Sequence, residues 1–213
     1  QAVIYEKIAI IGVGLIGAST ALAARRGKLV GHVTACDADP DAVETSRKLG
    51  FADEVIGDAK KAVVDADLVI MAVPVGAMGA LAELIVPAMK PGAVLTDTGS
   101  TKRSVLRDVD TVISDDIHWL PSHPLAGTEH SGPTAGHAHL FDGRYWIVVP
   151  RDVPDDVVER FESFLTGLGS VTERMDADYH DKVLALTSHL PHLIAYTIAV
   201  SYTHLRAHET ADN

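Results

Sequence analysis

The stretch KIAIIGVGLIG, residues 7–17, decides the fold of this 213-residue chain. Lys7 to Gly12 is a continuous β-prone run, as expected for a parallel strand that helices cover on both faces. Gly12, Gly14 and Gly17 follow the pattern G-x-G-x-x-G, and Leu15 to Arg26 has the Ala- and Leu-rich composition of a helix. A strand that turns through such glycines into a helix is typical of a site for the phosphates of a dinucleotide.

Each residue of the glycine pattern has an expected task. Gly12 makes the tight turn, Gly14 lets the backbone approach the pyrophosphate, and Gly17 lets the helix pack closely on the strand. Leu15 and Ile16 open the helix, whose free N–H groups and positive dipole end hold the phosphates.

An acidic residue, Asp37, ends the second predicted strand, 32–37, at the distance that this fingerprint requires. Its carboxylate can accept hydrogen bonds from both hydroxyls of the adenine ribose and would repel the 2′-phosphate of NADP. The next residues, Ala38 and Asp39, supply no Arg for that phosphate. The sequence therefore predicts NAD as the cofactor.

Strands and helices alternate along the rest of the chain, which predicts an α/β fold of the Rossmann type with a doubly wound, mainly parallel sheet. Further strands are expected at 55–56, 67–73, 93–97, 117–120, 145–149 and 170–174, and helices at 40–49, 75–89, 101–109, 155–168 and 176 to about 200. Residues 122–142 are rich in His, Gly, Thr and Pro, and we expect a functional loop there. Residues 1–174 would form the cofactor domain.

Two strand ends lie at the carboxyl edge of this sheet, where doubly wound folds bind ligands. Ala72, Val73 and Pro74 end the fourth strand, so we expect their backbone to border the cofactor. Ser100 follows the fifth strand and is either a site residue or the N-cap of the helix after it.

Composition narrows the function classes. With 18 Lys and Arg against 29 Asp and Glu, the net charge of −11 argues against a nucleic-acid binder. The single cysteine, Cys36, excludes an intramolecular disulfide and a cysteine zinc site, and a reducing cytosol is the simplest compartment. We find no convincing targeting signal. Residues 183–205 carry no Asp, Glu, Lys or Arg, but their Ser, Pro and His residues favour a buried helix near a site over a membrane span.

Hydride transfer coupled to proton loss needs a group that binds and polarises a hydroxyl, and histidine suits this task. His123 follows the sixth predicted strand at the carboxyl edge, which makes it the best candidate. His118 lies within a predicted strand, and the remaining histidines of this region lie in the polar loop: His130, His137 and His139. A three-histidine metal site is the alternative interpretation, but the spacings are irregular, so we predict no metal.

A second polar group lies in SHLPH, residues 188–192. If this segment is helical, Ser188 and His192 share one face, which suggests a site at a domain junction. Histidines that are buried and hydrogen-bonded for structural reasons are the alternative. No G-x-S-x-G elbow supports a serine nucleophile.

Five segments, in this order and spacing, resemble the prephenate/arogenate dehydrogenases of tyrosine biosynthesis. They are IIGVGLIG at 10–17, AVP at 72–74, DTGSTK at 97–102, HPLAGTE at 123–129 and SHLPH at 188–192. The resemblance runs from about Lys7 to Ala199, and the two histidine segments are far more specific than the glycines.

The resemblance implies an oxidative decarboxylation in which NAD+ takes a hydride from the ring carbon that bears the hydroxyl, CO2 leaves, and the ring becomes aromatic. His123 matches the histidine that bonds the ring hydroxyl, and Ser100 the serine that orients it. Thr128 and Glu129 match residues that line the substrate pocket, and the second domain contributes a polar face. That face would come from Ser188 and His192.

The family's SHLPH helix opens a larger helical domain that forms a homodimer and supplies an Arg for a substrate carboxylate. We expect residues 175–200 to be the first helix of that domain, here incomplete. Residues 201–213 do not resemble the family's continuation and are expected to be a non-native tail, although a short natural variant is an alternative. Two other functions stay open: another small-acid dehydrogenase of the β-hydroxyacid or imine-reductase type, and an NAD-binding remnant without chemistry.

Overall fold

The computed structural model describes residues 3–188. The main sheet has six parallel strands in the order β3-β2-β1-β4-β5-β6, which is the Rossmann order. Their bounds are β1 Tyr5–Ile11, β2 Val30–Cys36, β3 Glu54–Ile56, β4 Leu68–Met71, β5 Val94–Asp97 and β6 His118–Trp119. The α/β prediction is confirmed. Strands are added from β1 toward β3 on one side and from β4 toward β6 on the other, and such folds bind their ligands at this switch point between β1 and β4.

Helices cover both faces of this sheet because successive side chains of a strand point to opposite faces. In β1, Ile8 and Ile10 pack into one buried cluster with α1 and α6, whereas Ala9 and Ile11 pack into another with α4 and α5. The helix bounds are α1 Leu15–Arg26, α2 Pro40–Leu49, α3 Ala59–Ala62, α4 Met78–Ile85, α5 Arg103–Val109, α6 Asp155–Gly167 and α7 Ala177–Ser188. A strand buried on both faces explains the unbroken apolar run that opens the chain.

The helix expected over 75–89 is divided in the structure. Short 3-10 turns, η1 Val75–Ala77 and η2 Val86–Ala88, flank α4 on either side. Pro87 lies within the second turn, and because proline has no backbone N–H it cannot continue the α-helical hydrogen bonds. The short helix α3 was not expected from the sequence.

The structure corrects the prediction of an irregular loop over 122–142. Its first residues form β7 Ser122–Pro124, which pairs antiparallel with β8 Tyr145–Val148, and β8 pairs parallel with β9 Val171–Arg174. The remainder of the loop contains only the 3-10 turn η3 Pro133–Ala135 as regular structure. After β6 the chain breaks at Pro121 and enters this separate three-stranded sheet, so His123 lies within the strand β7.

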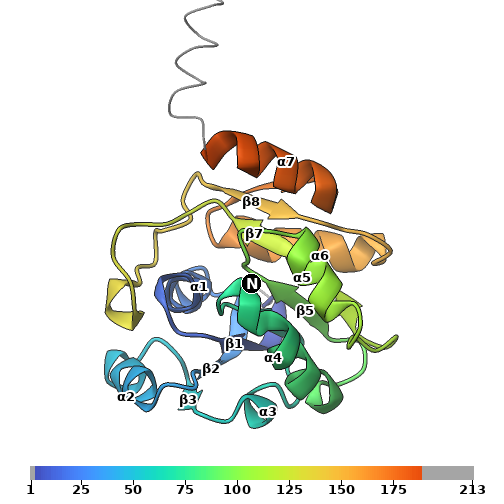
Figure 1. The fold of residues 1–213 in the computed structure, drawn as a ribbon. Coiled ribbons are helices and arrows are strands. Elements are labelled where there is room, and N and C mark those ends of the chain that lie inside the picture. The colour runs from blue at the N-terminus through green and yellow to red at the C-terminus, as the bar shows by residue number, and fades with distance from the viewer. Residues whose placement is uncertain (1–2, 189–213) are drawn as a thin grey trace, which may run out of the picture.

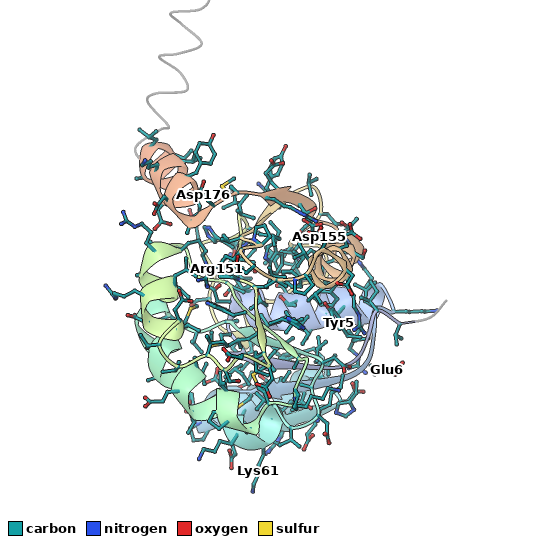
Figure 2. The ribbon with its side chains drawn as sticks, turned by 90° about the vertical axis from the view of Figure 1, so that its right-hand side faces the viewer. Tyr5, Glu6, Lys61, Arg151, Asp155 and Asp176 are labelled. Atoms are coloured by element: carbon teal, nitrogen blue, oxygen red, sulfur yellow. The ribbon has the colours of Figure 1, made fainter. Side chains whose placement is uncertain are left out.

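The second sheet and α7 occupy one end of the molecule. In Figure 1, α7 lies above β8, while α2 and α3 lie at the opposite end. Figure 2 shows the same arrangement from the side, with Asp176 at the start of the α7 segment and Lys61 of α3 far below it. α7 packs against α5, so residues 177–188 lie against the helices of the main sheet. The expected continuation of the helix to about residue 200 and the expected tail 201–213 lie outside the described residues.

Candidate functional site

The glycine turn has the geometry that its spacing predicts. Gly12 has a φ of +101°, and a Cβ placed there would lie 2.4 Å from the Ala72 carbonyl oxygen. A Cβ on Gly17 would lie 1.9 Å from the Gly12 carbonyl oxygen, so α1 can approach β1 only if this residue is glycine. A Cβ on Gly14 would meet nothing within 4 Å. The open space beside Gly14 is where a pyrophosphate could approach the backbone.

The first turn of α1 provides donors for such a group. Gly14 is the N-cap, and no side chain caps the helix or places an acid in its first turn. The free N–H groups of the helix start therefore face the space beside the glycine turn, together with the positive end of the helix dipole. Leu15 and Ile16 occupy this first turn and are half-buried. A bare helix start of this kind binds anions.

Asp37 follows β2 and is joined to the glycine turn by its side chain. Its Oδ2 accepts a hydrogen bond of 3.0 Å from the N–H of Val13, and its Oδ1 accepts one of 2.9 Å from the N–H of Asp39. These two bonds orient the carboxylate, and each oxygen keeps a lone pair for a further donor. The side chain is thus both a brace for the turn and a fixed acceptor at its rim.

A cavity of about 810 Å³ connects these features along the carboxyl ends of β1 to β4. The predicted backbone segment Ala72, Val73 and Pro74 lines it, and so do Gly57 and Asp58 from the turn between β3 and α3, which the sequence analysis missed. Its full lining is Ile11, Gly12, Gly14, Cys36, Asp37, Ala38, Gly57, Asp58, Ala59, Ala72, Val73, Pro74, Ala77, Leu81 and Leu84. Apolar walls with a few fixed polar groups suit a nucleotide.

Two acidic residues therefore line this cavity, Asp37 and Asp58. The Asp58 side chain accepts hydrogen bonds from the N–H groups of Lys60 and Lys61 as the N-cap of α3. Burial, helped by the negative charges of both aspartates, raises the pKa of Cys36 to about 11, so its thiol stays neutral. An aspartate at the start of a short helix after a strand was the signal that could have identified this second acid.

His123 lies in β7 opposite Ile147 of β8 and is 8% exposed. Its Nδ1 lies 2.9 Å from Nε2 of His180 in α7, and the Nδ1 of His180 lies 2.7 Å from Oδ1 of Asp181. Burial is the main cause that lowers the pKa of His123, to about 3, and the positive charge of Lys102 adds to it. His123 is therefore neutral and able to accept a hydrogen bond.

A buried ion pair lies beside this histidine. Lys102 and Asp97 are both completely buried; the Nζ of Lys102 donates to Oδ2 of Asp97 and, over 2.6 Å, to the carbonyl oxygen of Ser122. The N–H of Ser122 donates to Oδ1 of Asp97 over 3.1 Å, and the indole N–H of Trp146 donates to the Ser122 hydroxyl over 3.0 Å. Because Asp97 ends β5 and Ser122 opens β7, this network joins the two sheets next to His123 in the chain.

The other predicted site residues are less closely gathered. Ser100 is exposed, caps no helix, and makes no hydrogen bond to His123 in the described part of the chain. Thr128 and Glu129 are exposed in the loop after β7. Ser188 is the last described residue of α7, and His192 lies outside the described residues. Their roles stay predictions.

The remaining histidines of this region do not converge. His118 lies in β6, paired with β5, and His139 lies 2.7 Å from the Asp142 carboxylate, while His130 and His137 are exposed. Within residues 3–188, no three His, Cys, Asp or Glu side chains are arranged to hold a metal ion. In the same part of the chain, no helix combines the length and the apolar character that crossing a bilayer would require.

A six-stranded Rossmann sheet, a bare helix start behind a glycine turn and an acid at the end of β2 together define a dinucleotide-binding protein. Residues 20–174 match the protein family described as the nucleotide-binding domain of prephenate dehydrogenase. This chain belongs to the prephenate dehydrogenase family.

Individual relatives agree with this assignment. The chain is 41% identical over 196 residues to a cyclohexadienyl dehydrogenase from Zymomonas mobilis, covering 92% of this chain and 67% of the relative. It is 31% identical over 201 residues to a prephenate dehydrogenase from Bacillus subtilis, covering 93% of this chain but 54% of the relative. The chain thus spans between about half and two thirds of the length of these curated relatives.

A solved structure shows the same fold. It is a prephenate dehydrogenase from A. aeolicus in complex with hydroxyphenyl propionate and NAD+, with a TM-score of 0.79 and 27% identity. The match covers 93% of this chain and 70% of that one.

Proposed function

We propose that this chain catalyses the NAD-dependent oxidative decarboxylation of prephenate to 4-hydroxyphenylpyruvate. Arogenate, which would give tyrosine, is the alternative substrate. One observation carries the proposal: a buried, neutral histidine lies in the same domain as a dinucleotide cleft with a bare helix start. The names of the Bacillus subtilis and A. aeolicus relatives favour prephenate as the substrate.

NAD+ fits the cleft of this chain. The first turn of α1 would hold the pyrophosphate beside Gly14, and the Asp37 carboxylate would accept hydrogen bonds from the hydroxyls of the adenine ribose. A 2′-phosphate on that ribose would face the carboxylates of Asp37 and Asp58 without a cation among the residues that line the cleft, which favours NAD over NADP. When bound, the nicotinamide supplies the acceptor for the hydride.

His123 would act on the substrate hydroxyl. As the C–H bond beside that hydroxyl gives up its hydride, the O–H proton moves to Nε2 of His123 and a C=O bond forms. The substrate's ring carboxylate then leaves as CO2, and the electron pair of the broken C–C bond makes the ring aromatic. The resulting phenolate takes a proton back, so His123 is neutral again at the end of the cycle.

The test follows NADH absorbance after the chain is mixed with NAD+ and either prephenate or arogenate. We expect His123→Asn to lower kcat by about 10²- to 10⁴-fold, the usual contribution of a positioned acid–base group. His118→Asn is the matched control, because His118 is a half-buried histidine of the other sheet, and it should leave the rate unchanged. Turnover that survives His123→Asn would remove His123 from the mechanism, and NAD+ binding without any turnover would support a nucleotide-binding chain without chemistry.

A further inference from the structure

Three side chains in hydrogen-bond contact connect β7 to α7: His123, His180 and Asp181. His180 lies 57 residues further along the sequence and is completely buried, and its ring meets that of His123 edge-on with 5.1 Å between the ring centroids. Asp181 follows it and lies against the start of α5, where its two oxygens accept hydrogen bonds of 2.7 and 3.0 Å from the N–H groups of Lys102 and Arg103. A largely buried, hydrogen-bonded series of this kind restricts where its protons lie.

The proton positions follow from the Asp181 end. Burial is the largest influence on the pKa of Asp181 and raises it, but the backbone N–H groups of Lys102 and Arg103 and the side chain of His180 together hold it below its ordinary value. Asp181 is therefore a carboxylate and can only accept, so Nδ1 of His180 carries the proton between them.

The proton on Nδ1 of His180 determines the tautomer of His123. A His180 whose one ring proton lies on Nδ1, against Asp181, has a lone pair on Nε2 that accepts a hydrogen bond from Nδ1 of His123. His123 then holds its proton on Nδ1, and its Nε2 is bare. Within residues 3–188, Nε2 of His123 has no hydrogen-bond partner in the protein. It is not one of the fully buried side-chain atoms that lack a partner, so this nitrogen is accessible. The bare nitrogen is thus available to a ligand.

We propose that His180 and Asp181 are positioning residues that fix His123 in the tautomer whose Nε2 accepts the substrate proton. This inference rests on the proposed function. His180 holds Nδ1–H of His123, and Asp181 holds His180, in the way that an aspartate orients the histidine of a hydrolase triad. When His123 takes up a proton, the negative charge of Asp181 also favours the charged form, which partly offsets the opposing effects of burial, Lys102 and His180.

As a consequence, the orientation of His123 depends on the packing of α7 against α5. Asp181 receives its hydrogen bonds from residues that precede and begin α5, and the pair between Arg103 and Asp178 joins the same two helices over 3.1 Å. The exposed pair contributes little, since both side chains are more than half exposed. The hydrogen bonds of the buried His180 and the partly buried Asp181 therefore connect α7 to the chemistry of His123.

The direct test is the ¹⁵N NMR spectrum of the histidine rings, assigned for His123 by its absence in His123→Asn. In the native chain we expect a protonated, pyrrole-type shift at Nδ1 of His123 and a bare, pyridine-type shift at Nε2. His180→Leu removes the acceptor while filling the buried space, and the two shifts should converge toward those of a histidine that exchanges tautomers. His180→Gln can place its amide oxygen near the former Nε2 and should restore the native pattern.

The outcomes separate the inference from the proposed function. A proton on Nε2 of native His123, or an unchanged tautomer in His180→Leu, would overturn the inference, and the native spectrum decides alone if the leucine variant does not fold. Where the native chain forms NADH, His180→Leu should lower kcat by about 10²- to 10⁴-fold at an unchanged KM for NAD+, and His180→Gln should recover most of it. Absence of NADH formation with the native tautomer in place would count against the proposed function only.

Discussion

The stability of the fold should depend on pH through His123. In the folded chain burial lowers the pKa of this side chain to about 3, whereas an unfolded histidine has an ordinary value of about 6.5. At pH values between these two pKa values, His123 binds a proton in the unfolded chain but not in the folded chain. The free energy of unfolding is therefore undiminished above the unfolded pKa and falls as the pH drops below it, by about 1.4 kcal/mol for each unit.

Replacement of His123 by Asn removes this titration and keeps an amide that can donate toward His180. Integration from pH 7 to pH 5 gives a loss of about 2 kcal/mol from His123 alone. Urea unfolding at the two pH values measures it, with the buried Trp119 and Trp146 as fluorescent reporters. The carboxylates titrate in both chains, so their effect cancels when the two losses are subtracted. The native chain should lose about 2 kcal/mol more than His123→Asn, and equal losses would show that His123 is not held in a buried, neutral state.

Three further predictions concern the cleft, the ion pair and the rate. Gly14→Ala should change the free energy of unfolding by no more than about 0.5 kcal/mol but weaken NAD+ binding, because its methyl group meets no protein atom. Gly17→Ala should destabilise the fold by about 1–3 kcal/mol, because its methyl group meets the backbone of Gly12. Urea unfolding measures the stability of both variants, and calorimetric titration measures their NAD+ binding. Lys102→Met should destabilise the fold by about 3–5 kcal/mol in urea unfolding, since it leaves Asp97 buried without its cation, and adding Asp97→Asn should recover part of the loss. The rate of NADH formation should fall in acid only well below pH 6.5, because the lowered pKa keeps His123 unprotonated down to that range; a fall centred on pH 6.5 would contradict this.

The parts of the fold that the sequence predicted are those with local signals. α1 and α2 have the bounds expected, because the glycine turn sets the start of the first and Pro40 and Gly50 bound the second. Gly50 has a positive φ of 67° at the C-cap, as a helix-ending glycine should. The parallel sheet follows from the alternation of such elements, each of which can be identified without its partner.

Features that depend on distant partners could not be predicted. β7 is three residues long and ends in Pro124, and only its pairing with β8 makes it a strand. Burial of Lys102 depends on Asp97 and on the carbonyl of Ser122 in the second sheet. His180 gave no sign of its contact with His123, because nothing in a helical sequence indicates which strand its face will meet.

The cofactor site can be tested most directly by calorimetric titration of the chain with NAD+ and with NADP+. We expect saturable binding of one NAD+ and at least about 10-fold weaker binding of NADP+, equivalent to about 1.4 kcal/mol, because the 2′-phosphate would face the carboxylates of Asp37 and Asp58. Equal or tighter binding of NADP+, or no saturable binding of NAD+, would contradict the assignment of the cleft between β1 and β4 as an NAD site.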